Sequence, residues 1–100
     1  MKMIHKQTLP WDANDEVTIF VPVHSHHLDV QMQDNDICVW YVCDPDESIN
    51  EKLVFRIVGT GWELPDDFIN KHFWIKTIQH DGYIWHIFLK QQTASVEITS

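Results

Sequence analysis

The chain has 100 residues, of which 44% are hydrophobic, and this suits one compact domain, 1–100, rather than two domains or a disordered chain. Its 15 acidic residues outnumber the 7 lysines and arginines and give a formal net charge of −8. That charge disfavours nucleic acid and anionic membranes as partners, because both are bound through basic surfaces. We also expect no signal peptide and no membrane-spanning segment, since no run approaches ~18 apolar residues.

Alternating polar and apolar residues predict a mainly β protein of about seven or eight short strands, folded as an antiparallel sandwich or a small barrel. The expected strands are Met1–Gln7, Glu16–Val21, Leu28–Gln33, Ile37–Cys43, Leu53–Val58, Phe73–Gln79 and Tyr83–Leu89, with a last edge strand at Val96 and Ile98. One short helix is expected near 65–70, where a proline precedes two carboxylates.

The segment Ile37–Cys43, with the sequence ICVWYVC, is apolar on both faces and predicts a central strand with cover on each side. Cys38 and Cys43 fall on opposite faces of it, so we expect two free thiols in a reducing cytoplasm. Asp34-Asn35 predicts a tight hairpin loop on the N-terminal side of this strand, because both residues tolerate positive φ.

The last hairpin is the clearest local signal, because Asp81-Gly82 is a preferred two-residue loop. On one face the expected pairs are His80 with Tyr83, Ile78 with Trp85, Lys76 with Ile87 and Trp74 with Leu89. On the other face they are Gln79 with Ile84, Thr77 with His86, Ile75 with Phe88 and Phe73 with Lys90. Both faces are largely apolar, which predicts a core on one side and a second layer or another subunit on the other. We therefore expect a homo-oligomer.

Several motifs occur in a fixed order over about nine-tenths of the chain: HKQTLP at 5–10, LDVQMQDNDICVWYVCDPDE at 28–47, FRIVGTG at 55–61, PDD at 65–67 and TIQHDGYIWHIF at 77–88. Together they resemble a family of small uncharacterised proteins found largely in bacteriophage and prophage genomes. The resemblance implies a phage origin and an accessory role in an infected cell, with no established activity, substrate or cofactor. The resembling family has a small-residue turn without histidines where this chain has His24-Ser25-His26-His27.

Those histidines are the weak metal candidates of the sequence. On an extended segment His24 and His26 would share a face, and Asp29 could be a third ligand. A zinc site needs about four ligands, or three and a water molecule, and no C-x-x-C motif supplies the remainder. The alternative is a solvent-exposed connection between two strands.

Gly59-Thr60-Gly61 follows a strand and invites two interpretations. Bare glycines let a backbone approach a phosphate, but the motif lacks the lysine and spacing of a P-loop. Asp66 and Asp67 would also repel an anion at the following helix. The alternative is a strand-terminating turn that needs positive φ, with Thr60 and Trp62 at the edge of a pocket.

The titratable groups near the last hairpin do not converge. The expected register places His80 opposite Tyr83 and turns His86 to the other face beside Thr77. A general acid–base pair requires convergence in a cleft, so the sequence does not predict an enzyme.

Trp62, Trp74, Tyr83 and Trp85 are the best candidates for an interface, since tryptophan and tyrosine are enriched among binding hot spots. The pattern leaves open which of these rings belong to the core. Trp11, in a predicted loop, favours contact with a partner.

The leading hypothesis is a small non-catalytic phage protein, without a cofactor, that binds and inhibits a host protein of antiviral defence in the host cytoplasm. The residues expected at its binding surface are Trp62, Trp74, Tyr83, Trp85, His80, Thr60 and Arg56. The first alternative is a protein that sequesters a nucleotide-like small molecule, with Arg56 or Lys76 meeting phosphate. The second is a metal-dependent hydrolase.

Overall fold

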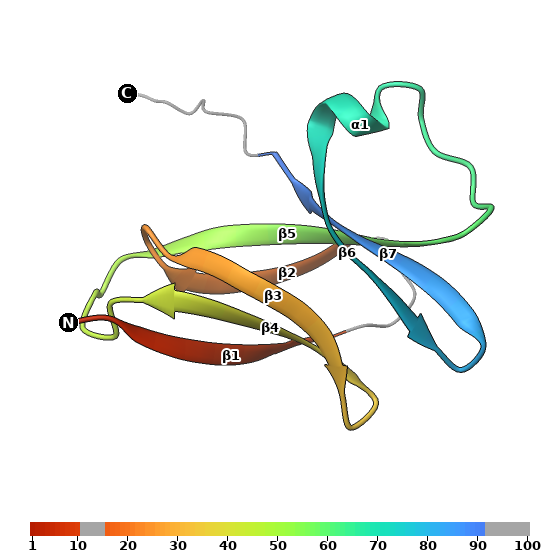
Figure 1. Ribbon diagram of the computed structural model, residues 1–100. Coiled ribbons are helices and arrows are strands. Elements are labelled where there is room, and N and C mark those ends of the chain that lie inside the picture. The colour runs from red at the N-terminus through yellow and green to blue at the C-terminus, as the bar shows by residue number, and fades with distance from the viewer. Residues whose placement is uncertain (11–15, 92–100) are drawn as a thin grey trace.

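A computed structural model describes residues 1–10 and 16–91, which form two antiparallel sheets and one short helix (Figure 1). The three-stranded sheet has the order β1-β4-β3, and the four-stranded sheet has the order β2-β5-β7-β6. The elements are β1 (Met3–Leu9), β2 (Glu16–Pro22), β3 (His26–Gln33), β4 (Asp36–Cys43), β5 (Asn50–Gly59), α1 (Phe68–Lys71), β6 (His72–His80) and β7 (Tyr83–Lys90).

The predicted mainly β fold is therefore confirmed, and over the described residues it is a two-sheet sandwich without barrel closure. Strand ends differ from the predicted ones by at most three residues. The last strand expected at Val96 and Ile98, and the loop residue Trp11, lie outside the described residues.

The main core lies between the sheets, because alternate residues of each strand point inward. The three-stranded sheet contributes Leu9, Val30, Ile37, Val39, Tyr41 and Cys43, and the four-stranded sheet contributes Val17, Ile19, Val21, Phe55, Ile57, Ile78 and Ile87. Burial of each large aliphatic or aromatic side chain stabilises the fold by about 1.5–3 kcal/mol.

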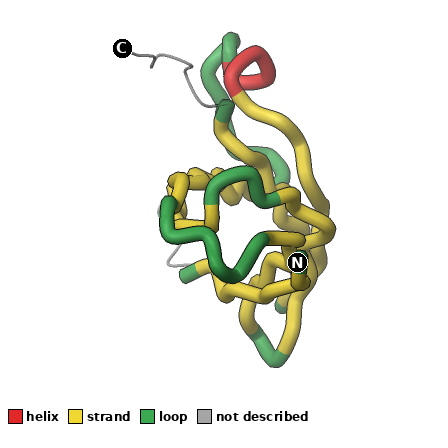
Figure 2. Tube along the Cα trace, turned by 90° about the vertical axis from the view of Figure 1, so that its left-hand side faces the viewer, coloured by secondary structure: helices red, strands yellow, loops and turns green. Residues whose placement is uncertain are grey.

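A second, smaller apolar cluster lies on the outer face of the four-stranded sheet and consists of Val58, Phe68 and Phe88. Helix α1 supplies Phe68, whose ring meets Phe88 edge to face at 5.0 Å and stacks on His72 at 3.9 Å. Figure 2 shows this helix set above the strands. The helix expected near 65–70 begins only at Phe68, and a turn closed by the Phe68 amide and the Pro65 carbonyl precedes it.

Side chains bridge the two sheets at both edges of the sandwich. At one edge Lys76 Nζ of β6 lies 2.9 Å from Asp29 Oδ1 of β3. At the other edge Gln7 Nε2 of β1 donates to the Phe20 carbonyl oxygen of β2 at 2.7 Å and to the Tyr41 hydroxyl at 2.9 Å. These bridges fix how the sheets lie on one another where no backbone ladder joins them.

The predicted hairpin loops are confirmed, since Asp34, Asn35, Asp81 and Gly82 all have positive φ. The register of the last hairpin is as predicted only near its loop. A β-bulge between Trp74 and Lys76 makes Trp74 pair with Phe88, so the expected pairing with Leu89 is wrong. The other shifted pairs are Phe73 with Leu89 and His72 with Lys90, in place of Ile75 with Phe88 and Phe73 with Lys90.

A second bulge, between His27 and Asp29, interrupts the pairing of β3 with β4 directly after the histidine segment. Strand β3 begins at His26, so His26 and His27 belong to the strand and only His24 lies in the connection, with a φ of 67°. Strict alternation would place Leu28 on the same side as Val30, but the bulge displaces it and its side chain is 47% exposed.

The Asp29–Lys76 bridge gives a pH-dependent prediction. The hydrogen bond from Lys76, followed by those from Gln31 and the Val30 amide, holds the pKa of Asp29 below its ordinary value of 3.8. Because the folded pKa is depressed, the stabilisation is present above pH 3.8 and is lost as the pH falls through the lowered pKa. We expect Asp29→Asn to lower the free energy of unfolding by about 0.5–1 kcal/mol at pH 7, since both side chains are partly exposed.

Urea denaturation at pH 7 and in acid measures this difference between Asp29→Asn and the unsubstituted protein. The same substitution in a Lys76→Met background serves as the control, because the bridge is already absent there. A loss of stability that is equal in both backgrounds, or unchanged in acid, would contradict the assignment.

Candidate functional site

A hollow of about 590 Å³ lies at one end of the four-stranded sheet. Figure 1 shows the closed end of the β6–β7 hairpin projecting beyond the three-stranded sheet in this region. We call the cavity the aromatic hollow; it is lined by Gly59, Thr60, Trp62, Gly82, Tyr83, Ile84 and Trp85. Segments far apart in sequence meet here because β5 pairs with β7 and brings Gly59 opposite Trp85.

The turn after β5 carries Trp62 back onto the sheet. The Trp62 amide donates to the Gly59 carbonyl at 3.2 Å, and Gly61, the third residue of this turn, has a φ of +91°. This is the pattern of a type II turn, which requires glycine at that position. A Cβ atom built on Gly59 would lie 2.7 Å from Trp62 Nε1, so the indole rests directly on the Gly59 backbone.

Three aromatic rings of different exposure line the hollow. Trp85 packs on the main core and meets Trp62 edge to face, with ring centroids 5.7 Å apart and an interplanar angle of 89°. The ring centroids of Tyr83 and Trp85 lie 6.1 Å apart, and the two ring planes form an angle of 47°. Trp62 and Tyr83 are 44% and 65% exposed. Trp85 is thus shared between core and hollow, whereas Trp62 and Tyr83 present their rings to solvent.

A chain of polar side chains anchors the turn from the outer face of the sheet. Thr60 Oγ1 lies 2.8 Å from His86 Nε2, and His86 Nδ1 lies 3.0 Å from Thr77 Oγ1. Trp74 Nε1 donates to Thr77 Oγ1 at 3.0 Å, which it can reach because the bulge turns Trp74 to this face. The Thr60 amide also donates to the Ile84 carbonyl at 3.3 Å. Thr60 is therefore held by both its backbone and its side chain.

The remaining predicted residues lie elsewhere. Trp74 belongs to the polar chain just described, and the guanidinium of Arg56 lies 5.4 Å from the centroid of the Phe68 ring in the second cluster. His80 Nε2 lies 3.2 Å from Asp81 Oδ2 beside the hairpin loop. Of the predicted binding residues, the hollow thus brings together Thr60, Trp62, Tyr83 and Trp85.

The metal candidates do not converge. His26 and His27 stack on each other with centroids 5.9 Å apart, while Asp29 is engaged by Lys76, Gln31 and the Val30 amide. Within residues 1–10 and 16–91, no group of three or more histidine, cysteine or acidic side chains could hold a metal ion.

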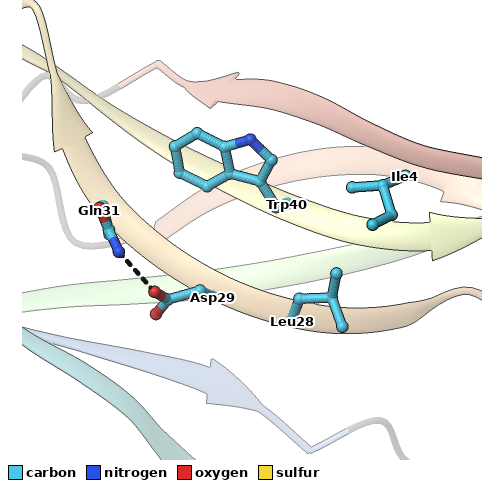
Figure 3. A pocket seen from close by; sticks show the side chains of 5 residues that line it. All are labelled: Ile4, Leu28, Asp29, Gln31 and Trp40. Atoms are coloured by element: carbon cyan, nitrogen blue, oxygen red, sulfur yellow. Dashed lines mark hydrogen bonds between the residues drawn. The ribbon is translucent and has the colours of Figure 1, made fainter.

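A second, shallower hollow of about 320 Å³ lies on the outer face of the three-stranded sheet, lined by Ile4, Leu28, Asp29, Gln31 and Trp40 (Figure 3). Ile4 is 61% exposed, and no described element covers this face. The sequence signal for it was the two-faced strand Ile37–Cys43, which predicted cover on both sides. Ile4 and Leu28 were not among the predicted interface residues, because each is a single aliphatic residue in an ordinary alternating strand.

The family model of a domain of unknown function, DUF7352, matches residues 1–97. The chain belongs to the DUF7352 family. The match agrees with the resemblance to an uncharacterised family noted from the sequence motifs. No curated protein and no solved structure matches the chain. In the described part of this DUF7352 protein, no helix is long and apolar enough to cross a membrane.

The contact between Gly59 and Trp62 gives a second prediction. We expect Gly59→Ala to displace the Trp62 indole and to lower the free energy of unfolding by about 1–3 kcal/mol, as other overpacking substitutions do. Thermal or urea denaturation measures the loss, and tryptophan fluorescence reports the displacement.

The matched control is the same substitution in a Trp62→Ala background, where the clashing ring is absent. There we expect Gly59→Ala to be neutral or slightly stabilising, since alanine restricts the unfolded chain more than glycine does. Equal losses in the two backgrounds would show that Gly59 is required for another reason.

Proposed function

We propose that this DUF7352 protein is a non-catalytic binding protein of phage origin that engages and inhibits a host protein of antiviral defence in the infected cell. The observation that carries the proposal is the aromatic hollow, in which the exposed rings of Trp62 and Tyr83 lie beside the partly buried ring of Trp85. Tryptophan and tyrosine at the centre of a concave surface are the usual hot spots of protein interfaces.

The arrangement of the titratable groups supports binding rather than catalysis. His86 has both ring nitrogens within hydrogen-bond distance of threonine hydroxyls, on the outer face of the sheet. His80 belongs to the opposite face, beside Asp81. Neither histidine lines the aromatic hollow, so no acid–base pair faces a substrate there.

The placement of the cations favours a protein partner over a phosphate-bearing small molecule. Arg56 lies over Phe68 in the second cluster, and Lys76 bridges to Asp29 at the sheet edge. Neither lines the hollow, where only uncharged side chains are found. The net charge of −8 further favours a partner with a basic surface. The phage origin rests on the motif resemblance.

The proposal predicts a host interaction that depends on the hollow. We expect the protein to retain a specific host protein from lysate, and Trp62→Ala or Tyr83→Ala to weaken that complex by at least ten-fold, the range of hot-spot substitutions. The same substitutions should remove any growth advantage that the gene gives the phage on defended hosts. Co-purification, titration calorimetry and plating efficiency measure these effects.

Phe73→Ala is the matched control, since Phe73 is an exposed ring of the same hairpin that lies outside the hollow. A host complex insensitive to Trp62 and Tyr83, or a phage that grows equally well without the gene on every defended host, would contradict the proposal.

We also propose that a second copy of the chain covers the outer face of the three-stranded sheet. A two-fold interface must be complementary to itself. This face meets that condition, because the exposed aliphatic side chains of Ile4 and Leu28 adjoin a hollow above Trp40 that could receive the same side chains of a partner copy (Figure 3).

Sedimentation velocity tests this association. We expect a dimer for the unsubstituted protein and a monomer for Leu28→Lys, because two buried lysines would face each other across the axis. Ile69→Lys, on the exposed side of helix α1, should leave the dimer intact. A monomeric unsubstituted protein, or a dimer that Leu28→Lys does not disturb, would contradict the assignment.

A further inference from the structure

The rings of the aromatic hollow present their faces in different directions. The planes of Trp62 and Trp85 are perpendicular, and Tyr83 is tilted by 47° from Trp85. Each indole or phenol face carries partial negative charge, which attracts a cation placed within about 6 Å of the ring centre. A group entering the aromatic hollow would therefore meet the negative faces of more than one ring.

The charged residues near the aromatic hollow are acidic and would attract a cation. Every side chain lining the hollow is uncharged, so no described lining residue would repel one. Glu63 follows Trp62 in sequence and is exposed, and Asp81, beside Gly82, has a side chain that is 80% exposed. The whole chain carries a net charge of −8. These charges would draw a basic group toward the rings and raise its local concentration.

We infer that the aromatic hollow receives an arginine side chain of the partner protein, in an inference that rests on the binding function proposed above. The hollow has a volume of about 590 Å³, which is far larger than an ammonium group needs, and it is open to solvent. A planar, weakly hydrated guanidinium can stack flat on one ring while its edge N–H groups reach acceptors at the rim. Glu63 and Asp81, two exposed carboxylates that adjoin the lining residues Trp62 and Gly82 in sequence, would supply such acceptors.

The turn geometry forms the aromatic hollow before a partner binds. Trp62 is fixed against Gly59, and Thr60 is held by His86 and the Ile84 carbonyl. The rings therefore need not be ordered when an arginine enters, and this lowers the entropic cost of binding.

The test uses the full chain and three short peptides, acetyl-Gly-Xaa-Gly-amide, in which Xaa is arginine, citrulline or norleucine. Citrulline has nearly the same shape as arginine and no charge. Titrations followed by the indole N–H signals of the five tryptophans in ¹H–¹⁵N spectra show which ring each peptide meets. We expect saturable shifts at Trp62 and Trp85 with arginine, and affinity lower by about two- to five-fold or more with citrulline, the range of a cation–π contact at an exposed site.

Trp62→Ala should abolish the saturable shifts, and Phe73→Ala, which removes an exposed ring outside the hollow, should leave those of Trp62 and Trp85 unchanged. Equal affinity for citrulline and arginine, preference for norleucine, or shifts spread over all tryptophans that vanish in 0.5 M salt would overturn the inference. Any of these results together with a host complex that still depends on Trp62 would leave the proposed binding function intact and reject only the arginine.

Discussion

The aromatic hollow depends on the absence of one side chain. Gly59 is the last residue of β5 and pairs with Trp85 at the end of the β5–β7 ladder, and at this position any Cβ would lie 2.7 Å from the Trp62 indole. Glycine normally weakens a strand, because it costs backbone entropy and offers nothing to pack. Here its open space is filled from the next turn by Trp62, so the loss of packing at Gly59 is offset by an edge-to-face contact with Trp85.

Local signals were sufficient to predict the strands, both two-residue hairpin loops and the register beside the second loop, because each depends on neighbours in sequence. Thr60, Trp62, Tyr83 and Trp85 were also predicted as binding residues, each from turn chemistry or from the hot-spot tendency of its side chain. Their convergence was not predictable in this way. It follows from the pairing of β5 with β7, and alternation within a strand carries no information on which distant strand lies beside it.

The positions of the Trp74 and Arg56 side chains could not be predicted from their own strands. The bulge between Trp74 and Lys76 has no sequence signal of its own, yet it turns Trp74 away from the face of Trp85 and toward Thr77. Arg56, the single charge in its predicted strand, is placed over Phe68 by helix α1, which covers the outer face of β5 and β7. Neither position follows from the alternation of polar and apolar residues within one strand.

The two apolar surfaces of the protein differ in how firmly they are built, and this difference separates their roles. The outer face of the three-stranded sheet has a shallow hollow whose exposed rim residue, Leu28, sits at a β-bulge. The aromatic hollow is braced from behind by the hydrogen-bonded series Trp74, Thr77, His86 and Thr60, which ties β6, β7 and the turn after β5 together. These hydrogen bonds keep the rings of the aromatic hollow in place when no partner is bound. A directional contact such as cation–π stacking requires rings whose orientation is fixed in this way. A shallow aliphatic face needs only area and exclusion of water, which a second copy of the same surface supplies.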